Sequence, residues 1–265
     1  IRPRDWSSDV CSSDLQLLAC EMTGTLETLR AAMAPSGTLH AGINLGNSWL
    51  ASMDADGKPV GVSVDLSRAL ADSLECPVSF VVVDAANKAV TAVREELADV
   101  GFFAIDPLRG EGIRFTAPYL LIEGAYLVRD DSPLTHNEEV DRAGHRVLVS
   151  QGSAYDLYLT RTLKYAEILR DAKALTVVDV FAKGGYEVAA GVKQQLEAGA
   201  LVNPGHRLLP DRFMVIEQAM GLPATRDSRA YNYLTAFVEK AKSSGNIAKY
   251  LAHHQIKGAS VAPAA

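Results

Sequence analysis

The feature that most constrains the fold is a regular alternation of short apolar runs with segments of helical spacing. The runs at residues 39–44, 78–83 and 100–105 have the length and apolar character of strands. Between them, apolar residues recur three and four positions apart at 66–74 and 89–97, as they do on one face of a helix. This strand–helix order predicts a parallel sheet with helices packed on its faces.

The alternation resumes in the second half of the chain, after a charged loop at residues 129–142. The predicted elements follow in the order strand 146–149, helix 155–169, strand 175–178, helix 180–190, apolar run 192–196 and strand 213–218. Two further strand-like runs, 119–122 and 125–128, connect the two series, and the pattern is helical after residue 223. Two α/β series joined by extended crossovers predict two lobes with a cleft between them, where α/β proteins usually place ligands.

Residues 1–21 lack this pattern. An SSD triplet occurs twice, and three aspartates interrupt any apolar run of the kind that a signal peptide needs. We therefore expect this segment to be disordered or non-native. Two alternatives stay open: the tetrapeptide Leu17–Cys20 resembles a lipoprotein cleavage box, and Met22 is a candidate start of the native chain.

Composition and charge exclude several classes of function. The net charge of −6 and the lack of a Lys/Arg-rich stretch argue against nucleic acid or an anionic membrane as a partner. No run of ~18 apolar residues exists, so no membrane span is predicted. The three cysteines and six histidines show no metal-ligand spacing, and there is no nucleophile elbow, P-loop or dinucleotide-binding glycine motif. We therefore expect no metal and no cofactor.

Five segments resemble, in their order and spacing, the motifs of one protein family. They are GTLHAGINLGN (37–47), DGKPVGVSVDLSRALADSL (56–74), DVGFFAIDPLRGEGIRFTAPY (99–119), VSQGSAYDLYL (149–159) and the C-terminal FMVIEQAMGLP…FVEKAKSSGNIAKYL. From about Gly37 to Gly258 the chain resembles the family 3 bacterial solute-binding proteins, the amino-acid-type receptors of ABC transporters.

The resemblance implies an α/β fold of the two-lobe, periplasmic-binding-protein-like type II, with two hinge crossovers. Lobe 1 is then expected to comprise residues 22–123 and 219–265, and lobe 2 residues 124–218.

Arg109 and the segment Gly152–Ala154 are the first candidates for ligand binding. Arg109 follows the 100–105 run, and the resemblance implies that its guanidinium holds a ligand carboxylate through two parallel hydrogen bonds. Ser153 and Ala154 precede a predicted helix, whose N-terminal N–H groups form an anion site, and the resemblance places a second carboxylate contact at the Ala154 amide. The alternatives are a solvated loop arginine and an ordinary helix cap.

Asn47, Ala104 and Lys193 occupy further positions that the resemblance assigns to the ligand. Asn47 falls where family members often place an aromatic ring, which suggests hydrogen bonding in place of stacking; a turn-forming asparagine is the alternative. Ala104 stands where amino-acid receptors usually carry a Ser or Thr that accepts from the ligand ammonium. Val192 or Lys193 stands where they usually carry an ammonium-binding Asp.

These departures bear on the identity of the ligand. Lys193 would repel a ligand ammonium, and an unpaired buried charge is costly. They predict a carboxylate without the amino group, or a dicarboxylate that reaches Lys193. A register shift of a few residues would instead bring Glu187 or Glu197 to this position.

The resemblance implies a solute-binding protein of an ABC-type uptake system, which closes on a small carboxylate-bearing ligand, an amino acid or related organic acid, and catalyses no reaction. The expected partner is an ABC permease, and the expected location is periplasmic or extracellular, or cytoplasmic if Met22 is the native start. One alternative is a cytoplasmic or sensory ligand-binding domain. Another is an enzyme similar to the cyclohexadienyl dehydratases, with Glu123, Glu187 and Glu217 as the candidate general acids.

Overall fold

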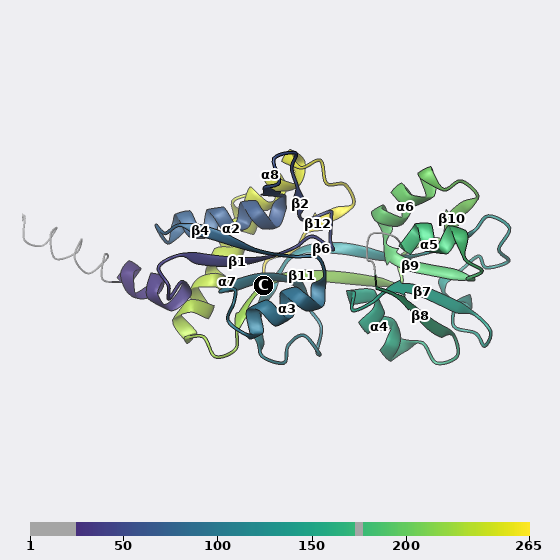
Figure 1. Cartoon of the computed structure of the whole chain (residues 1–265), viewed down its shortest axis with the longest axis horizontal. Coiled ribbons are helices and arrows are strands. Elements are labelled where there is room, and N and C mark those ends of the chain that lie inside the picture. The colour runs from purple at the N-terminus through teal and green to yellow at the C-terminus, as the bar shows by residue number, and fades with distance from the viewer. Residues whose placement is uncertain (1–24, 173–176) are drawn as a thin grey trace, which may run out of the picture.

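The structure is a computed structural model that describes residues 25–172 and 177–265. Figure 1 shows two groups of helices and strands joined by two long strands, β6 and β11. This arrangement confirms the α/β fold with two lobes and two crossovers that the sequence predicted. The expectations for residues 1–21 and for Met22 concern residues outside the described ranges.

The first lobe is built on a parallel sheet covered on both faces. Its strands are β1 (Leu39–Asn44), β4 (Val78–Val83) and β5 (Val100–Ala104), with β1 in the centre. Helix α2 (Val62–Ser73) contributes to the core on the face where Ala41 and Ile43 are buried. Helix α3 (Ala86–Arg94) covers the other face, where a Cβ at Gly42 would contact Val93. Burial on both faces explains why β1 and β5 are continuous apolar runs, whereas β4, at the edge of the sheet, is only half-buried.

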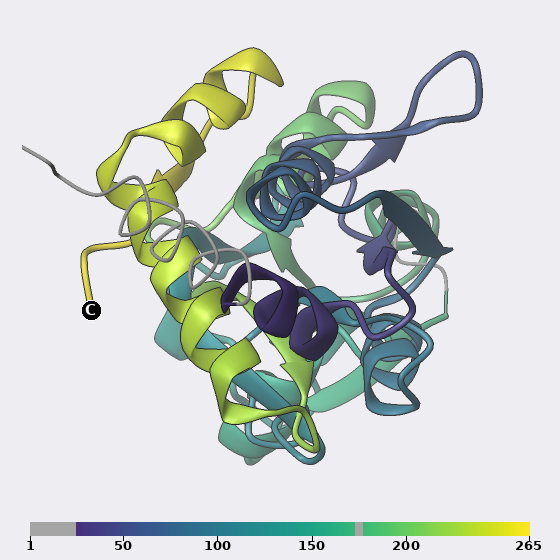
Figure 2. The same ribbon diagram turned by 90° about the vertical axis from the view of Figure 1, so that its left-hand side faces the viewer.

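The C-terminal part of the chain returns to this lobe. Helices α7 (Ser228–Ser243) and α8 (Asn246–His253) lie along one side of it in Figure 2, preceded in the chain by β11 (Met214–Pro223). The buried residues Leu234, Val238 and Ala241 recur at helical spacing on α7, as the sequence predicted. The lobe is completed by the helical residues 25–33, the hairpin β2 (Ser52–Met53) with β3 (Pro59–Val60), and the short strand β12 (Ala259–Val261).

The second lobe has its own parallel strands. Strand β7 (Arg146–Ser150) lies between β8 (Glu167–Asp171) and β9 (Val188–Val192). The remaining elements are η1 (Asn137–Glu139), α4 (Ala154–Thr162), α5 (Val177–Lys183), α6 (Lys193–Val202) and β10 (His206–Leu208). Phe181 of α5 and Leu196 of α6 are fully buried in one cluster with Leu148 of β7, whereas Val147 and Val188 belong to the cluster that continues into the first lobe.

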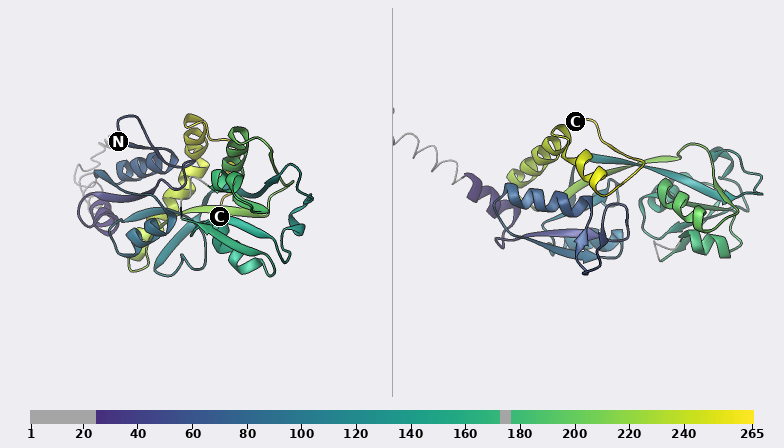
Figure 3. Two further views of the ribbon diagram at one scale, coloured as in Figure 1. Left: turned by 45° about the vertical axis from the view of Figure 1, so that its right-hand side comes forward. Right: turned by 90° about the horizontal axis from the view of Figure 1, so that it is seen from above.

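Two antiparallel strands connect the lobes. Strand β6 (Ile113–Arg129) and β11 pair with each other along most of their length, and both views of Figure 3 show them running between the two groups. Because β11 also pairs with β5 and β6 also pairs with β9, one sheet continues in the order β4-β1-β5-β11-β6-β9-β7-β8. The predicted lobe boundaries, 123/124 and 218/219, fall within these two strands and stay a prediction.

The prediction of two separate strands at 119–122 and 125–128 was wrong, since β6 is one strand of 17 residues. Gly124 lies at the expected break, but its backbone pairs with Met214 on one side and Val192 on the other. A Cβ on Gly124 would come within 2.7 Å of the Met214 side chain. Close packing, and not a turn, therefore accounts for this glycine.

The prediction of a helix over 155–169 was wrong in its second half, because α4 ends at Thr162 and β8 follows. The carboxylate of Asp141 accepts hydrogen bonds from three successive backbone N–H groups, those of residues 164–166, at 2.8–3.0 Å. These bonds hold the chain in a turn directly after the helix. Their acceptor lies more than 20 residues earlier, so helical periodicity could not indicate it.

The predicted elements between residues 175 and 196 also differ from the structure. Residues 175–176 lie outside the described part, while 177–178 begin α5 and are not in a strand. The predicted helix 180–190 contains the end of α5 and the start of β9, and α6 begins at Lys193. The sequence of β9, Val-Ala-Ala-Gly-Val, has little intrinsic strand preference. Its position between β6 and β7, where all five residues are buried, determines its conformation.

We expect Asp141→Ala to lower the free energy of unfolding by about 1–3 kcal/mol, because three backbone N–H groups lose their acceptor. Desolvation raises the pKa of Asp141, but the three hydrogen bonds outweigh it and hold the pKa below the ordinary 3.8. The stabilisation is therefore complete at neutral pH and is lost as the pH falls below 3.8. Urea denaturation at several pH values measures it. The exposed Asp131→Ala is the control, and equal stability of the two variants at pH 7 would contradict this account.

Candidate ligand-binding site between the lobes

A pocket lies where the two lobes meet, and it contains most of the residues that the sequence singled out. Asn47, Ala104 and Arg109 line it from the first lobe, and Ser153 and Ala154 line it from the second. The structure therefore brings together five of the six predicted residues. Their role in ligand binding stays a prediction.

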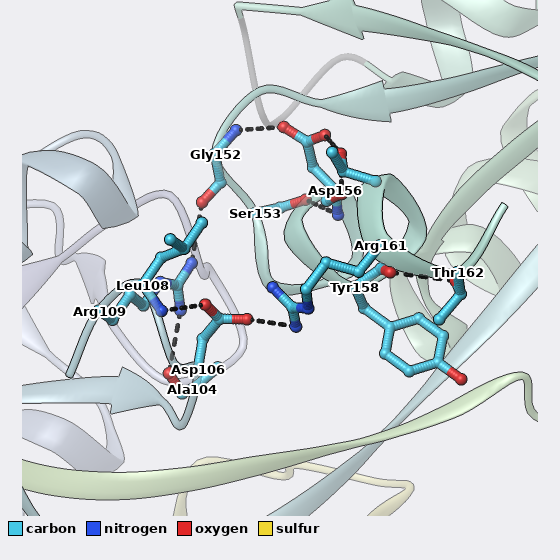
Figure 4. A network of polar contacts seen from close by, with 11 residues as sticks. Ala104, Asp106, Leu108, Arg109, Gly152, Ser153, Asp156, Tyr158, Arg161 and Thr162 are labelled. Atoms are coloured by element: carbon cyan, nitrogen blue, oxygen red, sulfur yellow. Dashed lines mark hydrogen bonds and ion pairs between the residues drawn. The ribbon is translucent and has the colours of Figure 1, made fainter. Parts of the chain in front are cut away.

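The guanidinium of Arg109 connects the two lobes. Its Nη1 donates to the carbonyl oxygen of Ala104 at 3.2 Å, and its Nη2 donates to that of Gly152 at 2.8 Å (Figure 4). The residue is only 6% exposed and forms no ion pair within the described part of the chain. Burial lowers the pKa of Arg109, while the nearby charge of Asp106 raises it. The two hydrogen bonds use two of its five N–H donors, so the remaining donors can bind an anion.

A tight turn at the carboxyl end of β5 positions Arg109. The carbonyl oxygen of Asp106 accepts hydrogen bonds from the backbone N–H groups of Arg109 and Gly110 at 3.1 and 3.0 Å. The Asp106 carboxylate also accepts from the backbone N–H of Leu108 at 2.9 Å. These bonds fix the turn, so little conformational freedom is left at the base of the arginine side chain.

Asp106 makes the second polar contact between the lobes. Its Oδ2 lies 2.7 Å from Nη2 of Arg161, which projects from α4 (Figure 4). The Asp106 side chain is 4% exposed and that of Arg161 is 41% exposed, so the pair lies at the edge of the interface. Sequence reasoning missed this pair. A short loop Asp after a strand indicates a capped turn, but nothing in the sequence identifies an arginine 55 residues later as its partner.

The N-terminus of α4 faces the pocket from the second lobe. Ser153 is the N-cap, and its Oγ accepts from the backbone N–H of Asp156 at 3.1 Å, as the sequence predicted for a cap. Gly152 has a φ of +71°, a conformation that favours glycine. The backbone N–H groups of Ala154 and Tyr155 have no hydrogen-bond acceptor within the described residues. These N–H groups and the helix dipole form a site for an anion.

The buried carboxylate of Asp156 stabilises the turn at Gly152. The residue is 3% exposed, and its carboxylate accepts from the backbone N–H of Gly152 at 2.8 Å. Nε of Arg170, on β8, donates to both carboxylate oxygens at 3.0 and 3.2 Å. The negative charge of Asp156 is therefore compensated before any ligand binds. Sequence reasoning missed the pair because it placed the segment before residue 170 in a helix.

The loop after β1 supplies Asn47. Its backbone carbonyl accepts from Leu50 and Ala51 at 3.0 and 3.2 Å, so the residue does form a turn, as the alternative proposed. Its side-chain Oδ1 is buried and has no hydrogen-bond partner in the described structure. Both features coexist, since the turn uses the main chain and leaves the amide free for a ligand.

Lys193 is not among the described residues that line the pocket; Val192 and Gln195 are. Its Nζ lies 3.0 Å from Oε2 of Glu123 on β6, and Glu123 also binds Arg212 at 3.0 Å. The hydrogen bonds from Lys193 and Arg212 hold the pKa of Glu123 below its ordinary value. The last residue of β9 thus faces the pocket, and the following lysine is neutralised at the crossover.

No group of three or more His, Cys, Asp or Glu side chains in residues 25–172 and 177–265 could hold a metal ion. No helix in the same ranges is long and apolar enough to cross a membrane.

The family model of the bacterial extracellular solute-binding proteins, family 3, matches residues 39–255. A comparison with curated proteins found no match. Three solved structures illustrate the likeness. The receptor for L-cysteine of Neisseria gonorrhoeae has a TM-score of 0.73 and 22% identity, with 86% of this chain and 94% of that chain covered.

A histidine kinase sensor domain with similarity to periplasmic binding proteins has a TM-score of 0.72 and 18% identity, covering 85% of this chain and 98% of that one. The ancestral amino-acid-binding protein AncCDT-1, a precursor of cyclohexadienyl dehydratase, has a TM-score of 0.70 and 19% identity, covering 86% and 98%. At these identities the likeness shows the fold, which is the predicted type II periplasmic-binding-protein fold.

We expect Arg170→Met to loosen the turn at Gly152, because it removes the cation that compensates the buried Asp156. The free energy of unfolding should fall by about 1–3 kcal/mol, and hydrogen exchange at residues 152–156 should accelerate. Arg142→Met is the control, since its side chain is 61% exposed and its only ion pair with a described residue is 3.8 Å long; a change below about 0.5 kcal/mol is expected there. Unchanged exchange in the Arg170 variant would show that the turn forms without this pair.

Proposed function

The chain belongs to family 3 of the bacterial extracellular solute-binding proteins, and on that premise we propose that it captures a small carboxylate-bearing ligand between its lobes for an ABC-type uptake system. The observation that carries the proposal is the buried guanidinium of Arg109, which has no ion-pair partner within the described residues. A carboxylate compensates such a charge with two parallel hydrogen bonds. An ABC permease is the proposed partner. Because the family is typically periplasmic or extracellular, we propose the same location for this chain.

Contacts from both lobes support capture by closure. Arg109 belongs to the first lobe, and the free N–H groups of Ala154 and Tyr155 belong to the second. A ligand that contacts both sets binds the closed arrangement more tightly than an open one, and this difference in affinity drives closure. The crossovers β6 and β11 are the proposed hinge, since they are the two long strands that link the lobes.

Ligand capture without chemistry accounts for the acidic residues better than an enzyme does. The hydrogen bonds of Lys193 and Arg212 lower the pKa of Glu123, and the hydrogen bond of Arg146 lowers that of Glu187. A general acid needs the opposite, a pKa raised towards neutrality. Glu217, the third candidate, is not among the described residues that line the pocket.

A sensory role is the second candidate. The likeness to the histidine kinase sensor domain favours it, because that domain shares the fold over nearly its whole length. Both roles require the same ligand-binding closure, so the binding experiments below apply to either. They differ in the partner, which is a permease for transport and a signalling domain for sensing.

We expect a thermal-shift screen of small carboxylates to identify ligands that stabilise the protein by about 2.7 kcal/mol when present at 100 times their Kd. Arg109→Ala should abolish this shift. Arg109→Lys keeps the charge but loses the planar fork, and it should weaken binding at least tenfold, or about 1.4 kcal/mol. Arg94→Ala, an exposed arginine on α3, is the control. Circular dichroism establishes that each variant is folded, and undiminished binding by a folded Arg109→Ala would refute the site.

We expect Arg161→Gln to accelerate ligand dissociation, because the ion pair with Asp106 forms between the lobes and stabilises the closed state. The affinity should fall about three- to tenfold, or roughly 0.6–1.4 kcal/mol, with most of the change in the dissociation rate. Stopped-flow displacement measures this rate, with Arg142→Gln as the matched exposed control. An unchanged dissociation rate in Arg161→Gln would exclude the pair as a stabiliser of closure.

A further inference from the structure

We propose that the ligand of this pocket is a small monocarboxylate that carries no ammonium group and whose remaining polar group is neutral, as in a 2-hydroxy or 2-oxo acid. The inference rests on the proposed function, because it names the class of ligand for the same pocket. It is carried by the distribution of charge around Arg109.

Arg109 is the only charged residue among the described residues that line the pocket. The segment 173–176, whose placement is not described, contains Lys173 and no Asp or Glu in the sequence. One carboxylate therefore balances the charge of the described lining. A zwitterionic amino acid brings an ammonium into a pocket without an acidic side chain, and a desolvated charge without a counter-ion is unfavourable.

Three acidic residues near the candidate site residues are already paired with a cation, and Glu217 is exposed and not among the described residues that line the pocket. The three pairs are Asp106 with Arg161 at 2.7 Å, Asp156 with Arg170 at 3.0 Å, and Glu123 with Lys193 at 3.0 Å. The two carbonyl groups that contact Arg109, those of Ala104 and Gly152, already accept hydrogen bonds from it. An ammonium therefore has no free carboxylate to bind among these groups.

Two helix N-termini make the pocket still less favourable for a cation. Helix α4 contributes Ser153 and Ala154 to the lining, and helix α6 contributes Val192 and Gln195. Val192 is the N-cap of α6, and no acidic residue lies in the first turn of this helix. The positive ends of both helix dipoles favour an anion and oppose an ammonium.

A second carboxylate on the ligand is also unfavourable. It would need a second cation, and among the described residues Lys193 is neither in the lining nor free, since Glu123 binds it. The described lining therefore matches a ligand with one carboxylate better than the dicarboxylate that the sequence left open.

Two neutral amide side chains can form hydrogen bonds with the remaining polar group of the ligand. Gln218 lines the pocket, is 7% exposed, and its side chain makes no hydrogen bond to the described residues. It pairs in register with Ala104, which places it next to the carbonyl that Arg109 contacts. The buried Oδ1 of Asn47 is likewise without a partner in the described part. The Asn47 oxygen accepts and so matches a hydroxyl, while the Gln218 amide both donates and accepts and so matches a hydroxyl or an oxo oxygen.

Calorimetry on the full chain tests the proposal with ligands that share a carbon skeleton. L-alanine, L-lactate and pyruvate form one set, L-leucine with its 2-hydroxy and 2-oxo analogues a second, and succinate with succinamate a third. The best hydroxy or oxo acid should bind at least tenfold more tightly than the matching amino acid, and succinamate more tightly than succinate. Tightest binding by an amino acid or by succinate, lost in Arg109→Ala, would overturn this inference and leave the proposed function intact.

Val192→Asp and Val192→Asn form a matched pair of variants. Both residues are favourable N-caps, so both variants should fold. The aspartate places a carboxylate in the pocket, and it should shift the ratio of amino-acid to hydroxy-acid affinity at least tenfold towards the amino acid. The asparagine should leave the ratio unchanged. Equal ratios in the two variants would show that charge at this position does not select the ligand, and would overturn the inference.

Gln218→Leu tests the neutral contact. It should weaken L-lactate at least fivefold and leave propionate, which lacks the hydroxyl, within twofold of the wild-type affinity. Equal losses for both compounds would remove Gln218 from the site. If no carboxylate of any class binds the wild type, the proposed function fails and this inference fails with it.

Discussion

The burial of the Arg109 guanidinium between the two lobes is the interaction on which the rest of the site depends. The turn at Asp106 fixes the base of the side chain, and carbonyl groups from both lobes accept its hydrogen bonds. Neutral carbonyls solvate a cation only in part, and the guanidinium has no ion-pair partner within the described structure. A bound anion would therefore supply the ion pair that the Arg109 guanidinium lacks at the interface between the lobes.

The architecture allows such a site because one sheet continues through both lobes. Strands β6 and β11 are hydrogen-bonded to each other and to the sheets on either side, so the connection is continuous in backbone pairing. Phe181 and Leu196 pack in a cluster within the second lobe, whereas Val147 and Val188 of that lobe belong to the same buried cluster as Ile43 of the first. Bending of β6 and β11 is the proposed route to closure, because these strands carry the chain between the lobes.

The sequence was sufficient where structure is decided locally. Strands β1 and β4 match their predicted bounds, because short apolar runs favour a strand and the run of β4 is rich in β-branched residues. The end of α4 and strand β8 were not predictable, because the carboxylate of Asp141 turns the chain from a distance. In the site, too, residues with a local sequence signal were predicted and residues that depend on distant partners were not. Arg109 and Ser153 were singled out by the family resemblance together with their places after a strand and before a helix. Arg161 and Arg170 were missed because their importance comes from partners elsewhere in the fold.

The fold determines the geometry of the cleft, whereas the ion pairs between side chains determine which ligand charge the cleft accepts. A type II fold places helix N-termini and strand ends around a cleft, and this geometry suits an anionic group in any member. Selection among anions depends on whether an acidic side chain remains free in the cleft. Here Asp106, Asp156 and Glu123 each have an arginine or lysine partner, while an apolar valine ends β9 at the pocket. Each pairing removes a negative charge that an ammonium would need, and the pocket retains a single positive charge. The ligand's charge is therefore set by side chains that contact one another, and not by the backbone that brings them together.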